Sequence, residues 1–233
     1  QVSCQVWSSL RCCRGSMATG CCTEVPHSHA PLPSPTANAE EIRRMLDCIE
    51  LEVLPKTELG VQAGNKVFGA AVLKDTEGVP TIIADTNNEM ECPLFHGEVH
   101  TMKKLSERPA EERPDPASCV FLSTHEPCCM CISAIVWAGY KKVFYLFGYE
   151  STKDQGIPHD LDIMYELWRV PKYQQQNKFC ATASICEQIA NQPEDVKTEL
   201  QAQVARITEK YNSLAKKYHT EKTSNANNKL AFG

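Results

Sequence analysis

Two short motifs about thirty residues apart constrain this chain more than any other feature. The first is His96-Gly97-Glu98, and the second is Pro127-Cys128-Cys129-Met130-Cys131. One imidazole and two thiolates suit zinc, and three protein ligands leave a tetrahedral ion with one open position. Catalytic zinc sites keep that position open, whereas structural sites fill it. A fold for this chain must therefore bring the two motifs to one point.

The second motif predicts the start of a helix that runs from Cys128 to Trp137 and ends at Gly139. Cys128 and Cys131 are three residues apart, so both sulfurs face the same way on the first turn. The positive end of the helix dipole favours ionised thiols at this place. Trp137 lies on the same helix, and we expect it to pack in the core.

Glu98 is close to the predicted metal ligand His96 but does not itself coordinate the metal. Zinc lowers the pKa of a bound water from about 15.7 toward about 7. Glu98 can take the proton of that water and later give it to a departing group, as general base and then general acid. We predict zinc (Zn²⁺) on His96, Cys128 and Cys131, with Glu98 as the catalytic residue.

Other interpretations of the same residues remain open. A single Cys-x-x-Cys pair is also typical of redox proteins and of half of a structural zinc site. The sequence has no second pair with comparable spacing, and a redox role does not need the His-x-Glu motif. His100 follows His96 by four residues, but the pattern is not the His-Glu-x-x-His of zinc proteases. We expect His100 to be an ordinary helical residue and Cys129 not to be a ligand.

Composition narrows the class of protein. The chain has 233 residues, 42% of them apolar, which is enough for one domain with extensions. Its formal net charge of -5 gives no general attraction to nucleic acid, so structured RNA is disfavoured as a partner. No apolar run is long enough to cross a membrane. The 13 cysteines of so long a chain indicate a reducing compartment, and we expect the cytoplasm.

We expect four segments along the chain. Residues 1–37 are predicted to be a disordered leader, because prolines crowd residues 31–35. The first methionine is Met17, and Arg11 and Arg14 leave an organellar transit peptide as an alternative. Residues 38–170 are predicted to form the zinc domain, 171–222 a helical C-terminal extension and 223–233 a disordered tail.

Apolar periodicity predicts the elements of the domain. A capping box of Asn38 and Glu41 predicts the start of an amphipathic helix. Apolar runs predict strands over 67–73, 81–84, 119–122 and 142–146, and helices over 96–107 and 128–137. This alternation predicts an α/β fold with helices on both faces of a mixed sheet.

A long helix is predicted to begin after Pro193. Its apolar residues recur in steps of three or four and form one seam: Val196, Leu200, Val204, Ile207, Tyr211, Leu214 and Tyr218. Two interpretations fit this seam. The helix packs on its own domain, or it pairs with a second copy in a homodimer.

At this point the chain resembles a known group. The run Glu126 to Cys131, followed by Ala134-Ile135 and Trp137, resembles the E-P-C-x-M-C…A-I-x-W pattern of the cytosine, guanine and tRNA-adenosine deaminases. These belong to the cytidine deaminase-like superfamily, with its H-x-E and P-C-x-x-C zinc signature. His96-Gly97-Glu98 is similar to the H-G-E of cytosine deaminases, where guanine and tRNA enzymes usually have H-A-E. The resemblance covers roughly residues 38–168.

The resemblance implies a three-layer α/β/α sandwich with a sheet of about five strands. It also implies a deaminase that converts an amino group on a nucleobase, nucleoside or nucleotide to a carbonyl. Cytosine-like and guanine-like substrates are both open. Family members often hold substrate through an asparagine, for which Asn87 and Asn88 are candidates, and Phe95 could stack on a base. Residues 156–160 depart from the family pattern where a pocket wall is commonly built.

Two further functions stay open. A tRNA-adenosine deaminase subunit could work with a partner that docks on the C-terminal helix. A non-catalytic zinc-binding scaffold could keep the fold, but such a protein would not need the shuttle carboxylate of Glu98.

Overall fold

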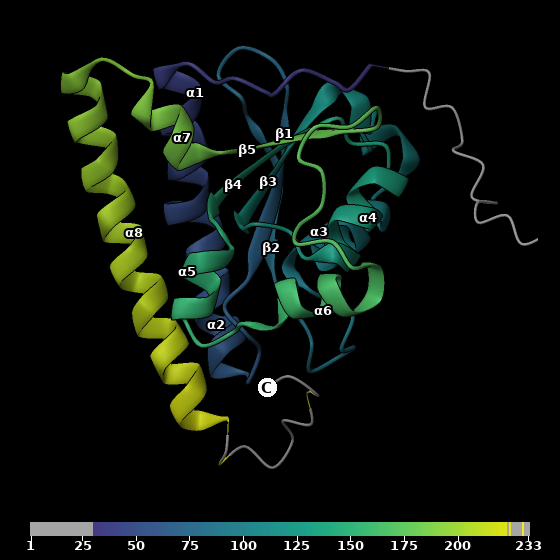
Figure 1. Ribbon diagram of the computed structural model, residues 1–233, viewed down its shortest axis with the longest axis vertical. Coiled ribbons are helices and arrows are strands. Elements are labelled where there is room, and N and C mark those ends of the chain that lie inside the picture. Colours follow the sequence, from purple (N-terminus) through teal and green to yellow (C-terminus); the bar gives the residue numbers. More distant parts are fainter. Residues whose placement is uncertain (1–29, 223, 225–229, 231–233) are drawn as a thin grey trace, which may run out of the picture.

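A five-stranded mixed sheet forms the centre of the fold, with strand order β2-β1-β3-β4-β5 (Figure 1). The coordinates are a computed structural model that describes residues 30–222, 224 and 230. The strands are β1 (Gly69–Lys74), β2 (Thr81–Thr86), β3 (Cys119–His125), β4 (Lys142–Phe147) and β5 (Ala181–Ser184). Strand β1 is antiparallel to β2 and β3, whereas β3, β4 and β5 are parallel. The predicted α/β class is confirmed.

Helices cover both faces of this sheet (Figure 1). They are α1 (Ala39–Asp47), α2 (Leu54–Gln62), α3 (Gly97–Ser106), α4 (Cys129–Trp137), α5 (Tyr149–Asp154), α6 (His159–Trp168), α7 (Ile185–Ala190) and α8 (Glu194–Glu221). A π-helical segment, Cys48–Val53, joins α1 to α2. Short 3₁₀ turns over Ala110–Glu112 and Pro116–Ser118 precede β3.

Alternating strand residues divide the core into two layers, because successive side chains of a strand point to opposite faces. One layer joins the sheet to α1, α2, α7 and α8, and its strand residues include Ala71, Leu73, Val120, Leu122, Phe144 and Leu146. The other layer joins the sheet to α3 and α4, and its strand residues include Ala70, Val72, Cys119, Phe121 and Val143. The chain is therefore a three-layer sandwich, as expected.

The N-terminus of α1 and the C-terminus of α4 have the local structures that their sequences predict. The Asn38 side chain accepts from the backbone N–H of Glu41, and the Glu41 carboxylate accepts from the N–H of Asn38, which completes the capping box. Helix α4 ends before Gly139, whose φ of 95° lies in the left-handed region that favours glycine.

The apolar seam of α8 packs on its own domain. Leu200, Ile207, Tyr211 and Tyr218 are fully buried, and α8 contacts α1, α2 and α7. Figure 1 shows α8 lying outside these helices as an additional layer. The intramolecular interpretation of the seam is confirmed, so the seam is not a free surface for dimer formation.

The structure corrects the expectation for Trp137. Its side chain is 89% exposed at the end of α4, whereas Ile135 of the same helix is fully buried. The sheet-facing positions of α4 are filled by smaller residues, and the indole projects from the other side.

The chain beyond residue 170 contributes to the sheet as well as to a helical extension. Strand β5 lies within the 171–222 segment and pairs with β4. The predicted domain boundary at residue 170 stays a prediction, but the sheet includes strands from both sides of that residue.

Most of the predicted leader and tail falls outside the described residues. In the described part, residues 30–37 contact the domain instead of leaving it. The N–H of Leu32 donates to the carbonyl of Asn177, and Ala37 is buried in the core. Among the described helices, none is both long and apolar enough to cross a membrane.

Candidate metal and catalytic site

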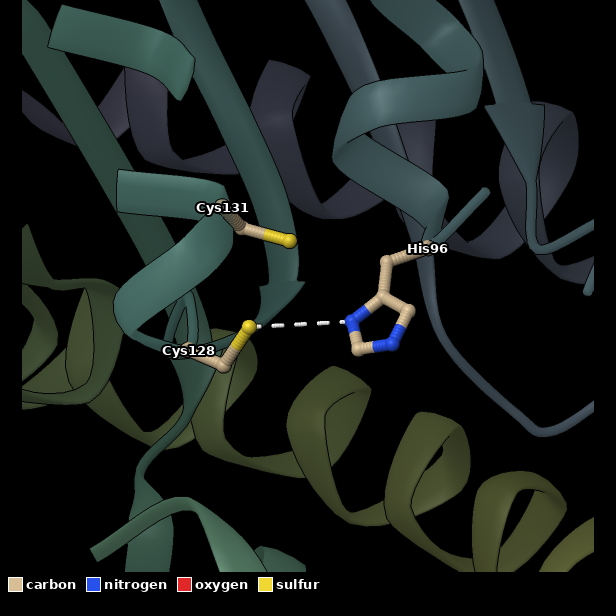
Figure 2. Close-up of side chains that lie close together, drawn as sticks. All are labelled: His96, Cys128 and Cys131. Atoms are coloured by element: carbon tan, nitrogen blue, oxygen red, sulfur yellow. Dashed lines mark hydrogen bonds between the residues drawn. The ribbon is translucent and has the colours of Figure 1, made fainter. Parts of the chain in front are cut away.

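The two motifs meet at the N-termini of two helices that lie on the same face of the sheet. His96 caps α3, Cys128 caps α4, and Cys131 lies on the first turn of α4. Figure 2 shows the imidazole on one side and the two sulfurs on the other, all pointing toward a common centre. The possible ligand atoms of His96, Cys128 and Cys131 lie within 4.8 Å of one another.

The spacing of these atoms fits a tetrahedral metal. Zinc binds sulfur at about 2.3 Å and imidazole nitrogen at about 2.0–2.1 Å, which separates the two ligands by roughly 3.5 Å in a tetrahedron. Cys128 Sγ lies 3.6 Å from His96 Nδ1. The donor set and its geometry therefore suit zinc, with Nδ1 as the ligand nitrogen of His96.

The protonation states of the three side chains depend on one another. The hydrogen bond from Cys131 and the neighbouring His96 hold the pKa of the Cys128 thiol well below its ordinary value. Burial raises the pKa of Cys131. Burial alone would lower the pKa of His96, but the Cys128 thiolate raises it to about 9. Without metal, the cluster is thus a thiolate beside an imidazolium and a neutral thiol.

Metal binding is expected to release about two protons at pH 7, because ligands must be deprotonated. One comes from His96, whose pKa lies above 7, and one from Cys131. Zinc affinity should therefore fall as the solution becomes acidic and rise with pH, most steeply below about 9, where both protons still have to leave. Calorimetric titration of zinc in buffers of different ionisation enthalpy measures the released protons. A count near zero would contradict these protonation states.

Glu98 lies on the first turn of α3 and is almost completely buried. The hydroxyl of Ser123, on β3, donates to Glu98 Oε1 at 3.0 Å. Burial raises the pKa of Glu98, and the negative charge of Cys128 adds to the shift. Raising a carboxyl pKa toward neutrality suits a group that must both accept and donate protons.

Gly97 allows the two motifs to come this close. A Cβ at position 97 would lie 2.6 Å from the Cα of Gly69 and 2.8 Å from its nitrogen. The start of α3 therefore rests directly on the backbone of β1. Glycine at this position is explained by packing, so it is not an argument for a cytosine substrate.

Replacing Gly97 with Ala is expected to destabilise the fold by about 1–3 kcal/mol, the usual cost of overpacking against a backbone that cannot give way. Urea unfolding of the metal-free protein measures this change. Gly148→Ala is the matched control, because its new Cβ would be 3.8 Å from its nearest neighbour. Equal stability of the two variants would contradict the close approach.

Asn87 is buried beside the metal cluster. Its amide Nδ2 donates to Glu89 Oε2 at 2.7 Å, and Glu89 Oε1 lies 3.6 Å from His96 Nε2. The carbonyl oxygen Oδ1 of Asn87 is buried and has no hydrogen-bond partner among the described residues. Such an acceptor can receive a donor from a bound molecule.

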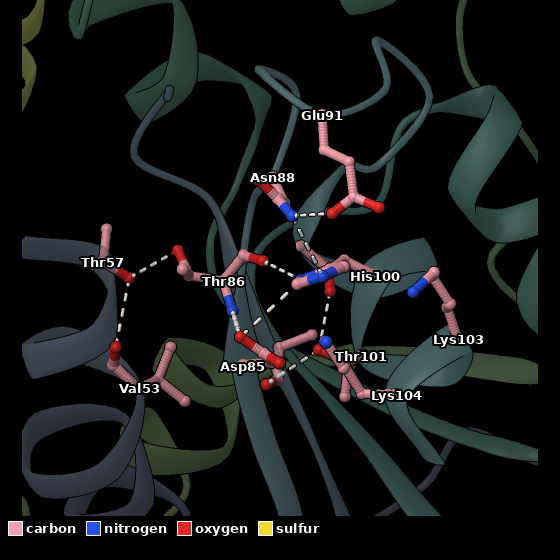
Figure 3. Close-up of polar contacts among 12 residues, drawn as sticks. Val53, Thr57, Asp85, Thr86, Asn88, Glu91, His100, Thr101, Lys103 and Lys104 are labelled. Atoms are coloured by element: carbon pink, nitrogen blue, oxygen red, sulfur yellow. Dashed lines mark hydrogen bonds and ion pairs between the residues drawn. The ribbon is translucent and has the colours of Figure 1, made fainter. Parts of the chain in front are cut away.

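Asn88 lies in another group of residues, which includes Glu91 and His100 (Figure 3). Phe95 contacts the same group through His100. The Asn88 amide donates to Glu91 and lies 3.5 Å from His100 Nε2. The ring of Phe95 stacks on His100 with 5.6 Å between ring centroids. Of the three predicted substrate contacts, only Asn87 is thus linked to a metal ligand through side-chain contacts, by way of Glu89. His100 contacts the carbonyl of Thr86 at 2.8 Å, in keeping with an ordinary helical residue.

Sequence reasoning missed several groups at the site. Asp160, on the first turn of α6, is half-buried. Burial, together with the charge of Cys128, raises its pKa to about 7. Phe68 stacks on the imidazole of His96 with 6.4 Å between ring centroids. Neither residue belongs to a local motif. Only Asp160 had a signal in the sequence, because it lies in the run 156–160 that departs from the family pattern.

Comparisons with known proteins agree with this site. A family model for the cytidine and deoxycytidylate deaminase zinc-binding region matches residues 51–147. Guanine deaminase of Bacillus subtilis (strain 168) is 32% identical over 124 residues, which cover 49% of this chain and 76% of the relative.

Two solved structures are also similar. The X-ray structure of guanine deaminase from Bacillus subtilis is 28% identical, covers 57% of this chain and 83% of its own, and has a TM-score of 0.43. Guanine deaminase from Nitrosomonas europaea is 17% identical, covers 85% of this chain and 100% of its own, and has a TM-score of 0.44. The matched family region includes His96, Cys128 and Cys131. With its motifs joined at one point and a relative matched over three-quarters of its length, the chain belongs to the cytidine deaminase-like superfamily.

Proposed function

We propose that this protein is a zinc-dependent hydrolytic deaminase of a guanine-type base. The observation that carries the proposal is the cluster of His96, Cys128 and Cys131, with a buried carboxylate beside it. Similarity to a guanine deaminase favours guanine over cytosine. The reaction consumes one water and one guanine and yields xanthine and ammonia.

Each residue has a defined task in this proposal. Zinc, when bound, supplies the acidity that makes water a nucleophile at neutral pH. Glu98 accepts a proton from the attacking water and donates it to the ring nitrogen beside the attacked carbon. It then accepts the remaining proton of the added hydroxyl and passes this proton to the departing amine, which leaves as ammonia. Ser123 donates to one oxygen of Glu98 and so holds the carboxylate in place for this transfer.

Asp160 supports the choice of guanine. The attacked carbon of guanine lies between two ring nitrogens, one of which receives the proton from Glu98 while the other carries an N–H. A carboxylate on that side can accept the N–H, whereas cytosine has an apolar C–H there. Helix α6, which carries Asp160, contacts α4, and the charges of Cys128, His96 and Glu98 all affect the pKa of Asp160. The ionised form of this carboxylate therefore suits the guanine edge.

An ammonia-release panel tests the proposal. The zinc-loaded protein is assayed on guanine, cytosine, cytidine, deoxycytidylate, adenine and adenosine. We expect kcat/KM for guanine to exceed that for each of the others by at least about 100-fold, because polar groups of the site stay unpaired with the wrong base. Turnover of cytosine or a nucleoside at the highest rate would overturn the choice of guanine. Absence of any ammonia would overturn the deaminase.

Asp160→Ala is expected to lower kcat/KM for guanine by about 10- to 100-fold, because a charged hydrogen bond to substrate is lost. The matched control is Asp162→Ala, since Asp162 is exposed on the same helix. Equal activity of the two variants would remove Asp160 from the substrate site.

A further inference from the structure

The carboxylate of Glu89 contacts three groups around the metal cluster. Lys66 Nζ donates to Oε1 at 3.0 Å, and Asn87 Nδ2 donates to Oε2 at 2.7 Å. The imidazole Nε2 of His96 lies 3.6 Å from Oε1. The side chains of Glu89 and Lys66 are only 1% and 8% exposed. One buried anion thus joins a cation, an amide and a predicted metal ligand.

Stability alone does not account for this buried ion pair. Removing two charges from water costs free energy, and their mutual attraction often only offsets this cost. A protein with apolar residues of similar volume in their place is commonly as stable. Glu89 is not part of either zinc motif and lies in the loop between β2 and α3. The contacts of its two carboxylate oxygens, with His96 and Asn87, indicate the role of the Glu89 charge.

The contact with His96 bears on the metal. Nδ1 of the imidazole faces the Cys128 sulfur, so Nε2 points away from the cluster and toward Glu89. A metal-binding histidine commonly directs its other ring N–H at a carboxylate, which fixes its tautomer and orientation. At 3.6 Å the contact is electrostatic rather than a hydrogen bond. It favours the proton on Nε2, and this leaves the Nδ1 lone pair for zinc.

The contact with Asn87 bears on the substrate. A carboxylate only accepts hydrogen bonds, so the amide of Asn87 must turn its NH₂ group toward Glu89. Its carbonyl oxygen then points the other way, where it is buried without a partner among the described residues. Glu89 therefore decides that Asn87 offers an acceptor to a bound molecule.

We propose that Glu89 is a positioning residue that orients both the metal-binding imidazole of His96 and the substrate-facing amide of Asn87. The substrate part rests on the proposed deaminase function, whereas the metal part does not. Lys66 pairs with Glu89, and this attraction offsets part of the cost of burying the carboxylate.

Zinc affinity tests the metal part without any assay of activity. Glu89→Gln keeps the size of the side chain and removes its charge, and we expect it to weaken zinc binding by about 10–100-fold in chelator competition. The absorption spectrum of the cobalt-substituted protein should also change, because the imidazole is less firmly oriented. The matched control is Glu91→Gln, two residues away and exposed, which should change neither measurement. Unchanged affinity and spectrum in Glu89→Gln would overturn the proposal.

A double variant separates positioning from simple neutralisation of Lys66. Glu89→Gln leaves a buried cation unpaired and can lower the stability of the fold for that reason alone. Lys66→Met combined with Glu89→Gln removes both charges and should recover the melting temperature. We expect zinc affinity to stay weakened in this double variant. Recovery of full affinity would show that Glu89 is only the counterion of Lys66.

Steady-state kinetics at saturating zinc test the substrate part. Freed from Glu89, Asn87 can present its NH₂ group instead of its oxygen, so KM for guanine should rise by about 10-fold or more in the double variant, with a smaller change in kcat. An unchanged KM would overturn this part. If the wild-type protein releases no ammonia, the proposed function fails, and zinc affinity still decides the role of Glu89.

Discussion

Replacement of Glu98 with Gln is expected to abolish ammonia release while leaving the metal site assembled. The amide cannot take a proton from water or return one to the ring and the amine. Each such transfer contributes about 10²–10⁴-fold to a rate, so we expect kcat to fall by at least about 10³-fold. Ser123 donates to Oε1 of Glu98, and an amide oxygen can accept the same hydrogen bond, so the side chain should keep its place.

The measurement combines metal analysis with an ammonia assay on the same sample. Glu107→Gln is a suitable control, because Glu107 is exposed at the C-terminal end of the same helix. The role of Glu98 would be refuted by a zinc-replete variant with full activity. Loss of zinc from the variant would instead point to a carboxylate that supports the metal.

Removing either thiol ligand is expected to abolish stable zinc binding. Structural sites in peptides bind zinc with a free energy of about 10–16 kcal/mol. Loss of one of three ligands should therefore weaken zinc affinity by at least about 10³-fold. Cys128→Ala and Cys131→Ala are therefore expected to be purified without metal and to lack activity. Chelator competition and metal analysis measure this loss.

The same variants should lose the stabilisation that zinc gives the wild-type fold. A ligand that binds only the folded state stabilises it in proportion to the logarithm of its concentration over Kd, so added zinc should raise the melting temperature of the wild type and not of the variants. Cys129→Ala is the matched control, because Cys129 lies between the ligands and packs against Tyr149 and Met164 instead. Full zinc occupancy in Cys128→Ala or Cys131→Ala would refute the ligand set.

Elements with strong local signals could be predicted from the sequence. The capping box at Asn38, the glycine after α4 and the apolar runs of β1 to β4 are all present as expected. Strand β5 could not be located in this way. It has only four residues, Ala181–Ser184, without the run of branched apolar side chains that marks β4. Its pairing with β4 decides its conformation.

The orientation of Trp137 shows a second limit of sequence reasoning. A helix that is apolar on most of its surface does not reveal which residues face the sheet. In α4 that choice is made by the packing of Ile135 against β1 and β3, which leaves the indole in solvent.

The sequence by itself determined the protein family, the three candidate metal ligands and the candidate proton shuttle. Its motifs are short, and a helix start fixes the relative directions of residues two or three positions apart. Only the tertiary structure revealed Ser123, Asp160 and the contacts of Glu89. These side chains come from a strand, a later helix and a loop, and no local spacing relates them to His96. Sheet pairing and helix packing bring them together, and burial then strengthens the interactions of their charges because little water remains to screen them.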